Sequence, residues 1–272
     1  MESPFVMSYR KSLAMCCRYL LLRAHLKEML ERLGLRGVSE LDSRYNISPG
    51  TKISAVRRSW RAGRTAVESI EAKEVMKASS CELAALRWGL VPAWTKDDSP
   101  GAGSVNARAE SLADKPSFRD AFRMRRCLIP ASGFYEWKAA GRARQPWLFQ
   151  RRDEQPFFLA GLWDAWIAPD GTSLETCVVI TTEPNKLMQP IHHRMPAILP
   201  VDAAESWLDM SSQPERLAAE FLRAFPADQL MARPVSSRVN SVANDDADCL
   251  SAMVVGAKPD DRQLAWDLGD GA

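Results

Sequence analysis

The sequence predicts an α+β fold, in which one domain is built on a mixed, mainly antiparallel sheet with flanking helices. Three observations lead to this prediction. Segments rich in β-branched and aromatic residues outnumber amphipathic segments, and the two kinds do not alternate as a doubly wound fold requires. No internal repeat is visible. No shift in composition along the 272 residues marks a second domain.

The first third of the chain predicts one helix and several short strands. Apolar residues recur every three or four positions over residues 20–33, which indicates an amphipathic helix that ends at Gly34. The turn Ser48-Pro49-Gly50 separates strands expected at 45–47 and 52–58. Residues 60–80 lack clear periodicity and predict a variable hairpin or insertion, which a strand over 82–90 follows.

Strands dominate the remainder of the chain. The polar, Gly- and Pro-containing residues 96–104 predict a loop. The strands expected after it, each bounded by turn residues, cover 127–129, 133–138, 147–151, 157–166, 175–182, 197–199 and 230–235. The helices expected among them cover 117–124, 203–208 and 214–224. We assign residues 1–14 to an N-terminal extension, 15–245 to the domain and 246–272 to a C-terminal tail.

Charge is divided unevenly between the two parts of the chain. Residues 1–152 contain 28 Lys and Arg against 15 Asp and Glu, whereas residues 153–272 contain 8 against 19. A phosphate-binding surface built mainly from the first part would explain this, and so would a chance division between solvated faces. The six cysteines lack Cys-x-x-Cys spacing, so we expect neither a disulfide framework nor a zinc site, and we expect a reducing cytosol.

Cys16, in the sequence Met15-Cys16-Cys17-Arg18-Tyr19, has a chemistry that depends on what precedes it. An N-terminal cysteine carries an amine and a thiol that titrate at about pH 8 and about pH 8.5. The pair can condense with an aldehyde, first to an imine and then, by closure of the sulfur, to a thiazolidine. An internal cysteine cannot, because its nitrogen is an amide.

Further along the chain, four more groups of residues attract attention. They are Arg44-Tyr45-Asn46-Ile47-Ser48-Pro49-Gly50-Thr51, then Arg87-Trp88-Gly89-Leu90-Val91-Pro92-Ala93-Trp94 with Asn106-Ala107-Arg108-Ala109-Glu110, then Gly133-Phe134-Tyr135-Glu136-Trp137, and Ile191-His192-His193-Arg194-Met195-Pro196. Each has an ordinary structural reading: Asn106 as a turn or capping residue, Glu136 as a solvent-facing strand residue, and the tryptophans as core. Adjacent histidines on a strand would also point to opposite faces.

Together and in this order, the groups resemble the SRAP family, the SOS response-associated peptidases understood as abasic site processing proteins. The family's Met-Cys-Gly-Arg-Tyr/Phe, Arg-Tyr-Asn-x-x-Pro, Trp-Gly-Leu-x-Pro-x-Trp, Asn-Ala-Arg-x-Glu, Gly-aromatic-aromatic-Glu-Trp and Ile-His-x-Arg-Met-Pro all have counterparts over residues 15–245. The resemblance implies an α+β fold around a β-barrel-like sheet, with a basic groove for single-stranded DNA.

The resemblance also implies site residues. The catalytic positions would be Cys16, Asn106, Glu136 and His192, which would form a covalent thiazolidine link to the opened sugar of an abasic site. The enzyme would combine peptidase-type N-terminal autoprocessing with lyase-like processing of abasic DNA. The positions expected to contact DNA are Arg18, Asn46, Pro49, Trp88, Trp94, Arg108, Trp137 and Arg194.

These roles agree with the chemistry of the side chains. A histidine can exchange the proton that opens the closed deoxyribose, and Glu136 between two aromatic rings is expected to move protons during imine formation. Asn106 can donate a hydrogen bond to a developing oxyanion or orient the amine. Arginines hold phosphates, and Pro49 and Trp137 would stack on bases. No metal or organic cofactor is needed.

The sequence departs from the family pattern in three places. Cys17 stands where the family has glycine, so positive φ or close DNA approach would cost about 1–3 kcal/mol there. His193 stands between the histidine and the arginine of the last motif. Fourteen residues precede Met15, and three explanations are open. Met15 is the true initiator, or Cys16 acts as the nucleophile that removes the leader. In the third, the leader stays and the protein binds DNA without a covalent link.

Two other function classes remain open. Cys16, His192 and Asn106 are also the residue types of a cysteine peptidase, and a non-catalytic single-strand-binding module needs none of the chemistry. The expected partner is single-stranded DNA with abasic sites, bound by a monomer, with replication-fork proteins as a further class and no membrane contact. We expect a bacterial cytoplasmic protein that associates with the nucleoid when bound to DNA.

Overall fold

Five strands form a closed ring at the centre of the molecule. The computed structural model describes residues 17–35, 42–59, 81–95, 103–141, 143–168 and 170–252. The ring runs β10-β4-β3-β6-β9 and closes where β9 pairs with β10. All its pairings are antiparallel except that between β10 and β4. Its strands are β3 (Lys52–Arg58), β4 (Cys81–Trp88), β6 (Arg126–Ala131), β9 (Phe157–Ile167) and β10 (Ser173–Thr182).

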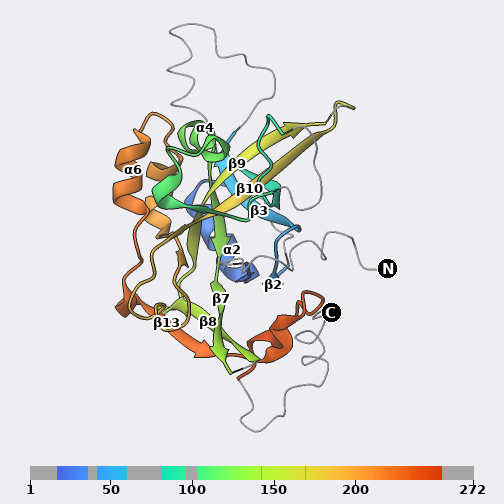
Figure 1. The fold of residues 1–272 in the computed structure, drawn as a ribbon, viewed down its shortest axis with the longest axis vertical. Helices are drawn as coiled ribbons and strands as arrows, with labels where there is room; N and C mark the ends of the chain where they lie inside the picture. Colours follow the sequence, from blue (N-terminus) through green and yellow to red (C-terminus); the bar gives the residue numbers. More distant parts are fainter. Residues whose placement is uncertain are drawn as a thin grey trace, which may run out of the picture.

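Three short strands extend this barrel, and a second sheet lies beside it. The short strands are β5 (Asn106–Arg108), β11 (Met195–Pro196) and β12 (Ile198–Leu199). The second sheet has the order β13-β8-β7-β1-β2. Its members are β1 (Tyr19–Leu21), β2 (Arg44–Ile47), β7 (Gly133–Ala140), β8 (Ala143–Arg151) and β13 (Leu230–Pro234). In Figure 1, the barrel strands β3, β9 and β10 occupy the upper part and β7, β8 and β13 the lower part.

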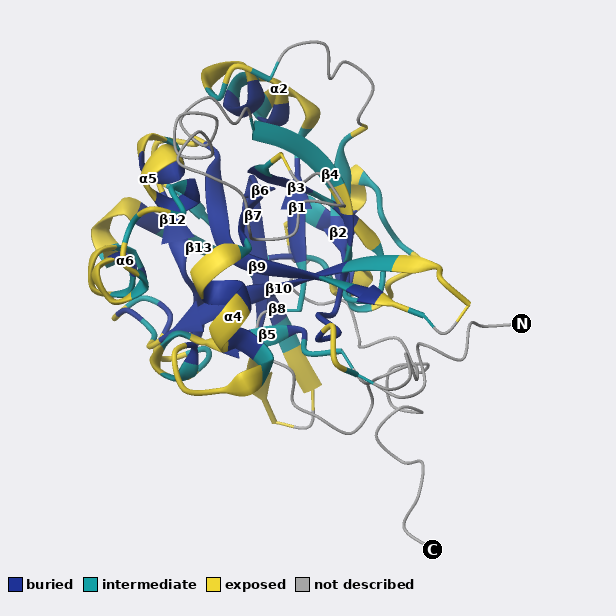
Figure 2. Cartoon of the chain, turned by 90° about the horizontal axis from the view of Figure 1, so that it is seen from above, coloured by how far each residue is buried: buried dark blue, intermediate teal, exposed yellow. Residues whose placement is uncertain are grey.

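The helices lie on the outside of the two sheets. They are α2 (Arg23–Arg32), α4 (Pro116–Met124), α5 (Ala204–Leu208) and α6 (Pro214–Phe221). Figure 2 shows buried residues gathered in the strands and exposed residues on the outer faces of these helices. The prediction of an α+β domain with a mixed, barrel-like sheet is thus confirmed. No helix in the described parts of the chain combines the length and apolar character that crossing a bilayer requires.

The main difference from the expected elements lies at residues 20–33. The helix begins only at Arg23, because Tyr19–Leu21 forms strand β1 between β2 and β7. Leu20 and Leu21 are buried in that sheet, so tertiary pairing outweighs the helical periodicity of their side chains. The helix ends as expected at Gly34, whose φ is +72°.

Two other sets of expectations concern residues outside the described ranges and residues at their C-terminal end. The predicted hairpin at 60–80 and most of the predicted loop at 96–104 lie outside the described residues, as does the 1–14 extension. At the other end, residues 247–250 form a 3-10 helix, and Cys249 is buried. Ordered structure thus continues past the expected boundary at residue 245 as far as 252, and the boundary itself stays a prediction.

Candidate active site

Cys17, two residues before β1, lies beside Glu136 of β7. Tyr19 pairs with Phe134 in an antiparallel register, and the Tyr135 N–H donates to the Arg18 carbonyl at 2.9 Å. Antiparallel pairing extended by two residues places Cys17 opposite Glu136. Glu136 is only 4% exposed, so it is not the solvent-facing residue that simple alternation allowed. Cys16 lies outside the described residues.

Asn106 reaches the same place from a different sheet. It begins β5, which runs parallel to β10 with Asn106 opposite Val179. The Asn106 amide nitrogen lies 4.0 Å from the Cys17 sulfur. Shortly before β5, Gly103 packs on the backbone of Gly89, where a Cβ would stand 2.5 Å from the Gly89 carbonyl oxygen. Three of the sequence motifs therefore meet at one point.

The Cys17 thiol is held in its protonated form. Burial, and then the charge of Glu136, raise its pKa to about 12, against the opposing effects of Arg18 and Asn106. A thiolate fraction of about 10⁻⁵ at neutral pH follows from that value, so Cys17 is a poor competitor for an aldehyde. The strain expected at Cys17 in place of the family's glycine stays a prediction, because the preceding residue, which defines the φ angle of Cys17, lies outside the described residues.

His192 lies in the connection between β10 and β11. The Arg194 N–H donates to Nδ1 of His192 at 3.1 Å, which leaves the proton of the neutral ring on Nε2. In the charged ring, Nδ1 can donate to the Arg194 carbonyl, which lies at 3.1 Å. Both protonation states therefore have a partner. His193 stacks on His192 with 4.4 Å between ring centroids, and burial followed by the charges of His192 and Arg108 lowers its pKa.

Arg194 itself is turned inward. Its guanidinium makes two 2.9 Å hydrogen bonds to the Glu110 carboxylate and donates to the Thr181 carbonyl at 2.7 Å. Only 8% of the side chain is exposed. These contacts join the motif that contains His192 to the one that contains Asn106. The predicted phosphate contact of Arg194 would compete with them.

Arg18 and Asn46 are bound to a segment that the sequence motifs did not include. Arg18 donates to the Asn46 side chain at 2.7 Å and to the Val239 carbonyl at 2.9 Å. The Asn46 amide donates to the carbonyls of Val239, Ser241 and Asn244 at 3.1, 2.9 and 2.7 Å. Asn46 is 1% exposed, so a direct DNA contact by its side chain would break these bonds.

Pro49 and the three tryptophans predicted to contact DNA differ in exposure. Trp88 is 1% exposed and donates to the Val105 carbonyl at 2.9 Å, so it packs in the core. Trp137 is half-buried, donates to the Asn240 side chain at 2.7 Å and lies 5.6 Å from the Arg18 guanidinium. Pro49 is half-buried in its turn. Trp94 is 65% exposed.

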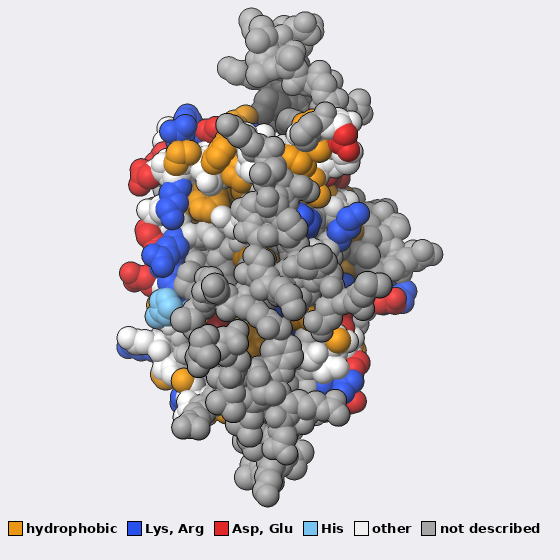
Figure 3. Space-filling model, turned by 45° about the vertical axis from the view of Figure 1, so that its right-hand side comes forward, with side chains coloured by type: hydrophobic (Ala, Val, Ile, Leu, Met, Phe, Trp, Pro, Cys, Tyr) orange, Lys and Arg blue, Asp and Glu red, His pale blue; other side chains and the backbone are white. Residues whose placement is uncertain are grey.

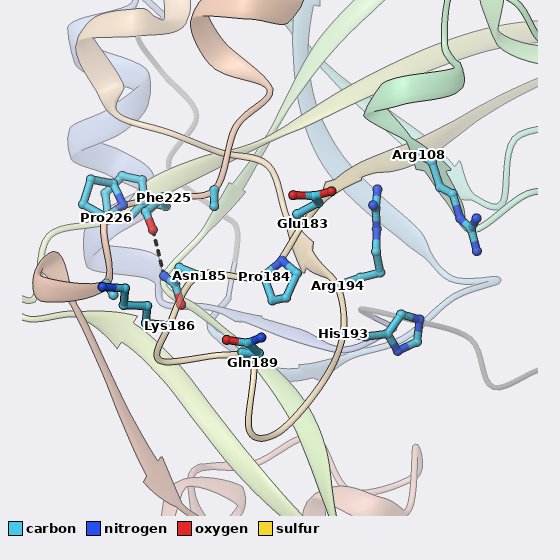
Figure 4. A pocket seen from close by; sticks show the side chains of 12 residues that line it. Arg108, Glu183, Pro184, Asn185, Lys186, Gln189, His193, Arg194, Phe225 and Pro226 are labelled. Carbon is cyan, nitrogen blue, oxygen red and sulfur yellow. Dashed lines mark hydrogen bonds between the residues drawn. The ribbon is translucent and has the colours of Figure 1, made fainter.

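Arg108 borders an open cavity of about 710 Å³. The cavity lies between the β10–β11 connection and residues 224–227. Figure 4 shows Arg108 and Arg194 at one end with His193 below them, and Lys186 at the other end. Figure 3 shows Lys and Arg side chains, with Asp and Glu among them, along the left margin of the view. The cavity wall combines cations with the apolar Pro184 and Pro226.

Sequence reasoning missed the segment around Asp245 and Asn240. Asp245 accepts from the backbone of Tyr45 and Asn46 and forms an ion pair with Arg44. The signal available in the sequence was the run Ser-Val-Ala-Asn-Asp-Asp at 241–246, which is typical of turns. Its partner in space, some 200 residues earlier, has no local trace in the sequence.

Comparisons with known proteins identify the family. The model of the SOS response associated peptidase (SRAP) family matches residues 15–242. Abasic site processing protein YoqW of Bacillus subtilis is 41% identical over 175 residues, which are 64% of this chain and 78% of YoqW. YoaM of the same organism is 36% identical over 214 residues, 78% of this chain and 86% of YoaM.

A solved structure shares the fold. The crystal structure of a Bacteroides thetaiotaomicron protein superposes with a TM-score of 0.69 and 25% identity, and it covers 89% of this chain and 98% of that protein. The family match spans the segments that carry Cys17, Asn106, Glu136 and His192. The chain belongs to the SOS response associated peptidase family.

Proposed function

We propose that this protein processes abasic sites in single-stranded DNA, through a covalent thiazolidine formed by Cys16 at the N-terminus of the mature chain. The observation that carries the proposal is the convergence of Glu136 and Asn106 on Cys17, the residue bonded to Cys16. The names of the relatives, abasic site processing proteins YoqW and YoaM, point to the same substrate.

The reaction balances without a cofactor. The deoxyribose ring opens to its aldehyde, and the Cys16 amine adds to that carbonyl and expels one water to give an imine. The Cys16 thiol then adds to the imine carbon and transfers its proton to the nitrogen, which closes the thiazolidine. In this scheme His192 exchanges the ring-opening proton, and Glu136 carries protons between amine, oxygen and water. Asn106 donates to the developing oxyanion.

Substrate binding would use exposed cations and rings rather than the buried ones. Arg108 is the exposed arginine of its motif. The cavity that it borders extends to Lys186. We assign the phosphates next to the lesion to this path, and the stacking of a flanking base to Trp94 and to Trp137. Arg18, Arg194, Asn46 and Trp88 would then act by shaping the site.

The first experiment is a denaturing gel of the protein incubated with an oligonucleotide that carries one abasic site. Wild type should give a shifted band whose mass is that of protein plus oligonucleotide less one water. Cys16→Ala should give none, while the neighbouring variant Cys17→Ala, as matched control, should keep the band. A band that persists in Cys16→Ala would refute the proposal. So would its absence from protein whose measured mass begins at Cys16.

Autoproteolysis is the second activity proposed, and the family description as a peptidase supports it. Hydrolysis of the Met15–Cys16 bond consumes one water and releases the Cys16 amine. A purification tag placed before Met1 tests it by intact mass. Loss of the tag from wild type together with retention in Cys16→Ala supports self-cleavage. Absence of the tag from both indicates that translation begins at Met15, and retention in both contradicts cleavage and thiazolidine formation alike.

A further inference from the structure

Residues 91–95, the connection that follows β4 and carries Trp94, form hydrogen bonds to the barrel at three alternate residues. The Val91 N–H donates to the Thr176 hydroxyl at 2.9 Å, and the Ala93 N–H donates to the Asp164 carboxylate at 3.2 Å. The Thr95 carbonyl accepts from the Trp166 indole at 2.7 Å. Trp94 itself lies between Ala93 and Thr95, and its side chain is 65% exposed.

Asp164 is the unusual member of this arrangement. It lies within β9 and is 6% exposed, and burial raises its pKa despite the nearby Arg125. One carboxylate oxygen lies 3.1 Å from Arg125 and accepts from the Ala165 N–H at 2.9 Å. The other oxygen is directed at the backbone of the Trp94 connection. Burying a carboxylate is unfavourable, so its placement here indicates that the shape of this connection matters.

Strand β10 contacts both this connection and the candidate site. β10 pairs with Asn106 at Val179 and holds Val91 through Thr176, three residues away. At about 3.3 Å per residue, the two points are separated by about 10 Å. In a stacked strand with about 3.4 Å per base, that distance corresponds to a few nucleotides. A DNA strand bound at Asn106 that follows β10 in this direction would reach the point where the connection that carries Trp94 is held.

We propose that Asp164 is a positioning residue for DNA binding, which acts through the backbone of Ala93 to hold Trp94 as a fixed stacking surface for a base beside the lesion. Stacking of a base on an aromatic side chain contributes about 1–3 kcal/mol. An indole that is already fixed loses less conformational freedom on binding than a mobile one. This inference rests on the proposed binding of single-stranded DNA but not on covalent chemistry.

A double-mutant cycle on an oligonucleotide without abasic sites tests it, with affinity measured by fluorescence anisotropy. Trp94→Ala should weaken binding about 5- to 150-fold, which is the stacking energy converted to a ratio. Asp164→Asn should weaken binding about 3- to 10-fold, because the neutral amide is a poorer acceptor for the Ala93 N–H. The double variant should bind as Trp94→Ala does alone, since Asp164 acts through that indole.

A matched carboxylate elsewhere provides the control. Glu82 pairs with Arg57 at 2.7 Å near the start of β4, whereas this connection follows the other end of β4, so Glu82→Gln should be additive with Trp94→Ala. Additive effects of Asp164→Asn and Trp94→Ala would overturn the inference. If Asp164→Asn does not fold, Trp166→Phe, which removes the bond to Thr95 together with part of the buried ring, replaces it in the same cycle.

The outcomes separate this inference from the proposed chemistry. Wild type that shows the coupled cycle but no covalent band contradicts the thiazolidine and supports Asp164 as a positioning residue. Wild type that forms the band but shows no coupling contradicts only the role of Asp164. Failure of wild type to bind the undamaged oligonucleotide overturns the inference, because no base is then held at Trp94.

Discussion

The two borders of the candidate site differ in what their polar side chains contact. One, the anchored border, consists of Arg18, Asn46 and Trp137, whose hydrogen bonds go to the segment 239–244. The other, the open border, consists of Trp94 and Arg108, which are exposed. Sequence motifs supply both borders, and the motif that contains the exposed Trp94 also contains the buried Trp88. Motif membership therefore does not separate residues that contact DNA from residues that shape the surface.

This difference has a physical basis. Arginine and asparagine side chains that already satisfy several buried acceptors lose those bonds if they turn toward DNA. Exposed cations can neutralise a phosphate without any such loss. The anchored border should consequently affect stability first and binding second, and the open border the reverse. Four substitutions test this contrast and extend it to the buried side chains of Arg194 and Cys17, in order of decreasing effect.

The largest effect is expected at Asn46. Asn46→Ala leaves three carbonyls without their donor, and at about 1 kcal/mol each it should lower the free energy of unfolding by about 3 kcal/mol. Denaturant titration measures this. Asn240→Ala, which removes one bond to Trp137, is the matched control and should lower it by about 1 kcal/mol. Equal stability of both variants and wild type would contradict the anchored border.

Arg194→Gln should have the next largest effect on stability, about 1–3 kcal/mol, because it removes charged hydrogen bonds to Glu110. Burial raises the pKa of Glu110, but the hydrogen bonds with Arg194 outweigh this and leave the pKa lowered. The pair therefore stabilises the fold above the carboxyl's ordinary pKa, and that stabilisation is lost as the pH falls through the lowered pKa. The stability difference between wild type and Arg194→Gln should accordingly shrink at acidic pH. A difference that is constant with pH would assign the effect to packing.

Arg108→Ala should change DNA binding and leave stability within about 0.5 kcal/mol. Loss of one phosphate contact should reduce affinity for single-stranded DNA several-fold. It should also reduce the slope of log affinity against log salt concentration by about 0.7. Arg119→Ala, on the exposed face of α4 beside Asp120, is the matched control and should leave the slope unchanged. An unaltered slope in Arg108→Ala would remove Arg108 from the open border.

Cys17 should show the smallest effect. Because burial and Glu136 raise its pKa to about 12, alkylation by iodoacetamide should be slow at pH 7 and should accelerate as the pH rises toward that value. Peptide mass mapping separates it from the other cysteines. Cys17→Ser should leave the yield of covalent band within about two-fold, in line with a thiolate fraction of about 10⁻⁵ at neutral pH. Rapid alkylation at pH 7 would show instead a thiolate that competes for the aldehyde.

Some features of the fold could be predicted because local sequence carries them. The helix end at Gly34 and the strands within 157–166 and 175–182 follow from turn chemistry and β-rich composition. Strand β1 could not be predicted, since Tyr19–Leu21 reads equally well as the first turn of a helix and is a strand because β2 and β7 flank it. The site was predictable only as a set of motifs, without the distances among them.

The sequence by itself determined the family, the order of the motifs and the imbalance of charge between the two parts of the chain. The tertiary structure decided where that charge is exposed. Arg44, Arg57 and Arg125 of the basic part are paired with Asp245, Glu175 and Asp164 of the acidic part. Part of the imbalance is therefore neutralised inside the fold rather than displayed as a basic face. Such pairs form only after chain folding brings distant residues together, and no local pattern of residues records them.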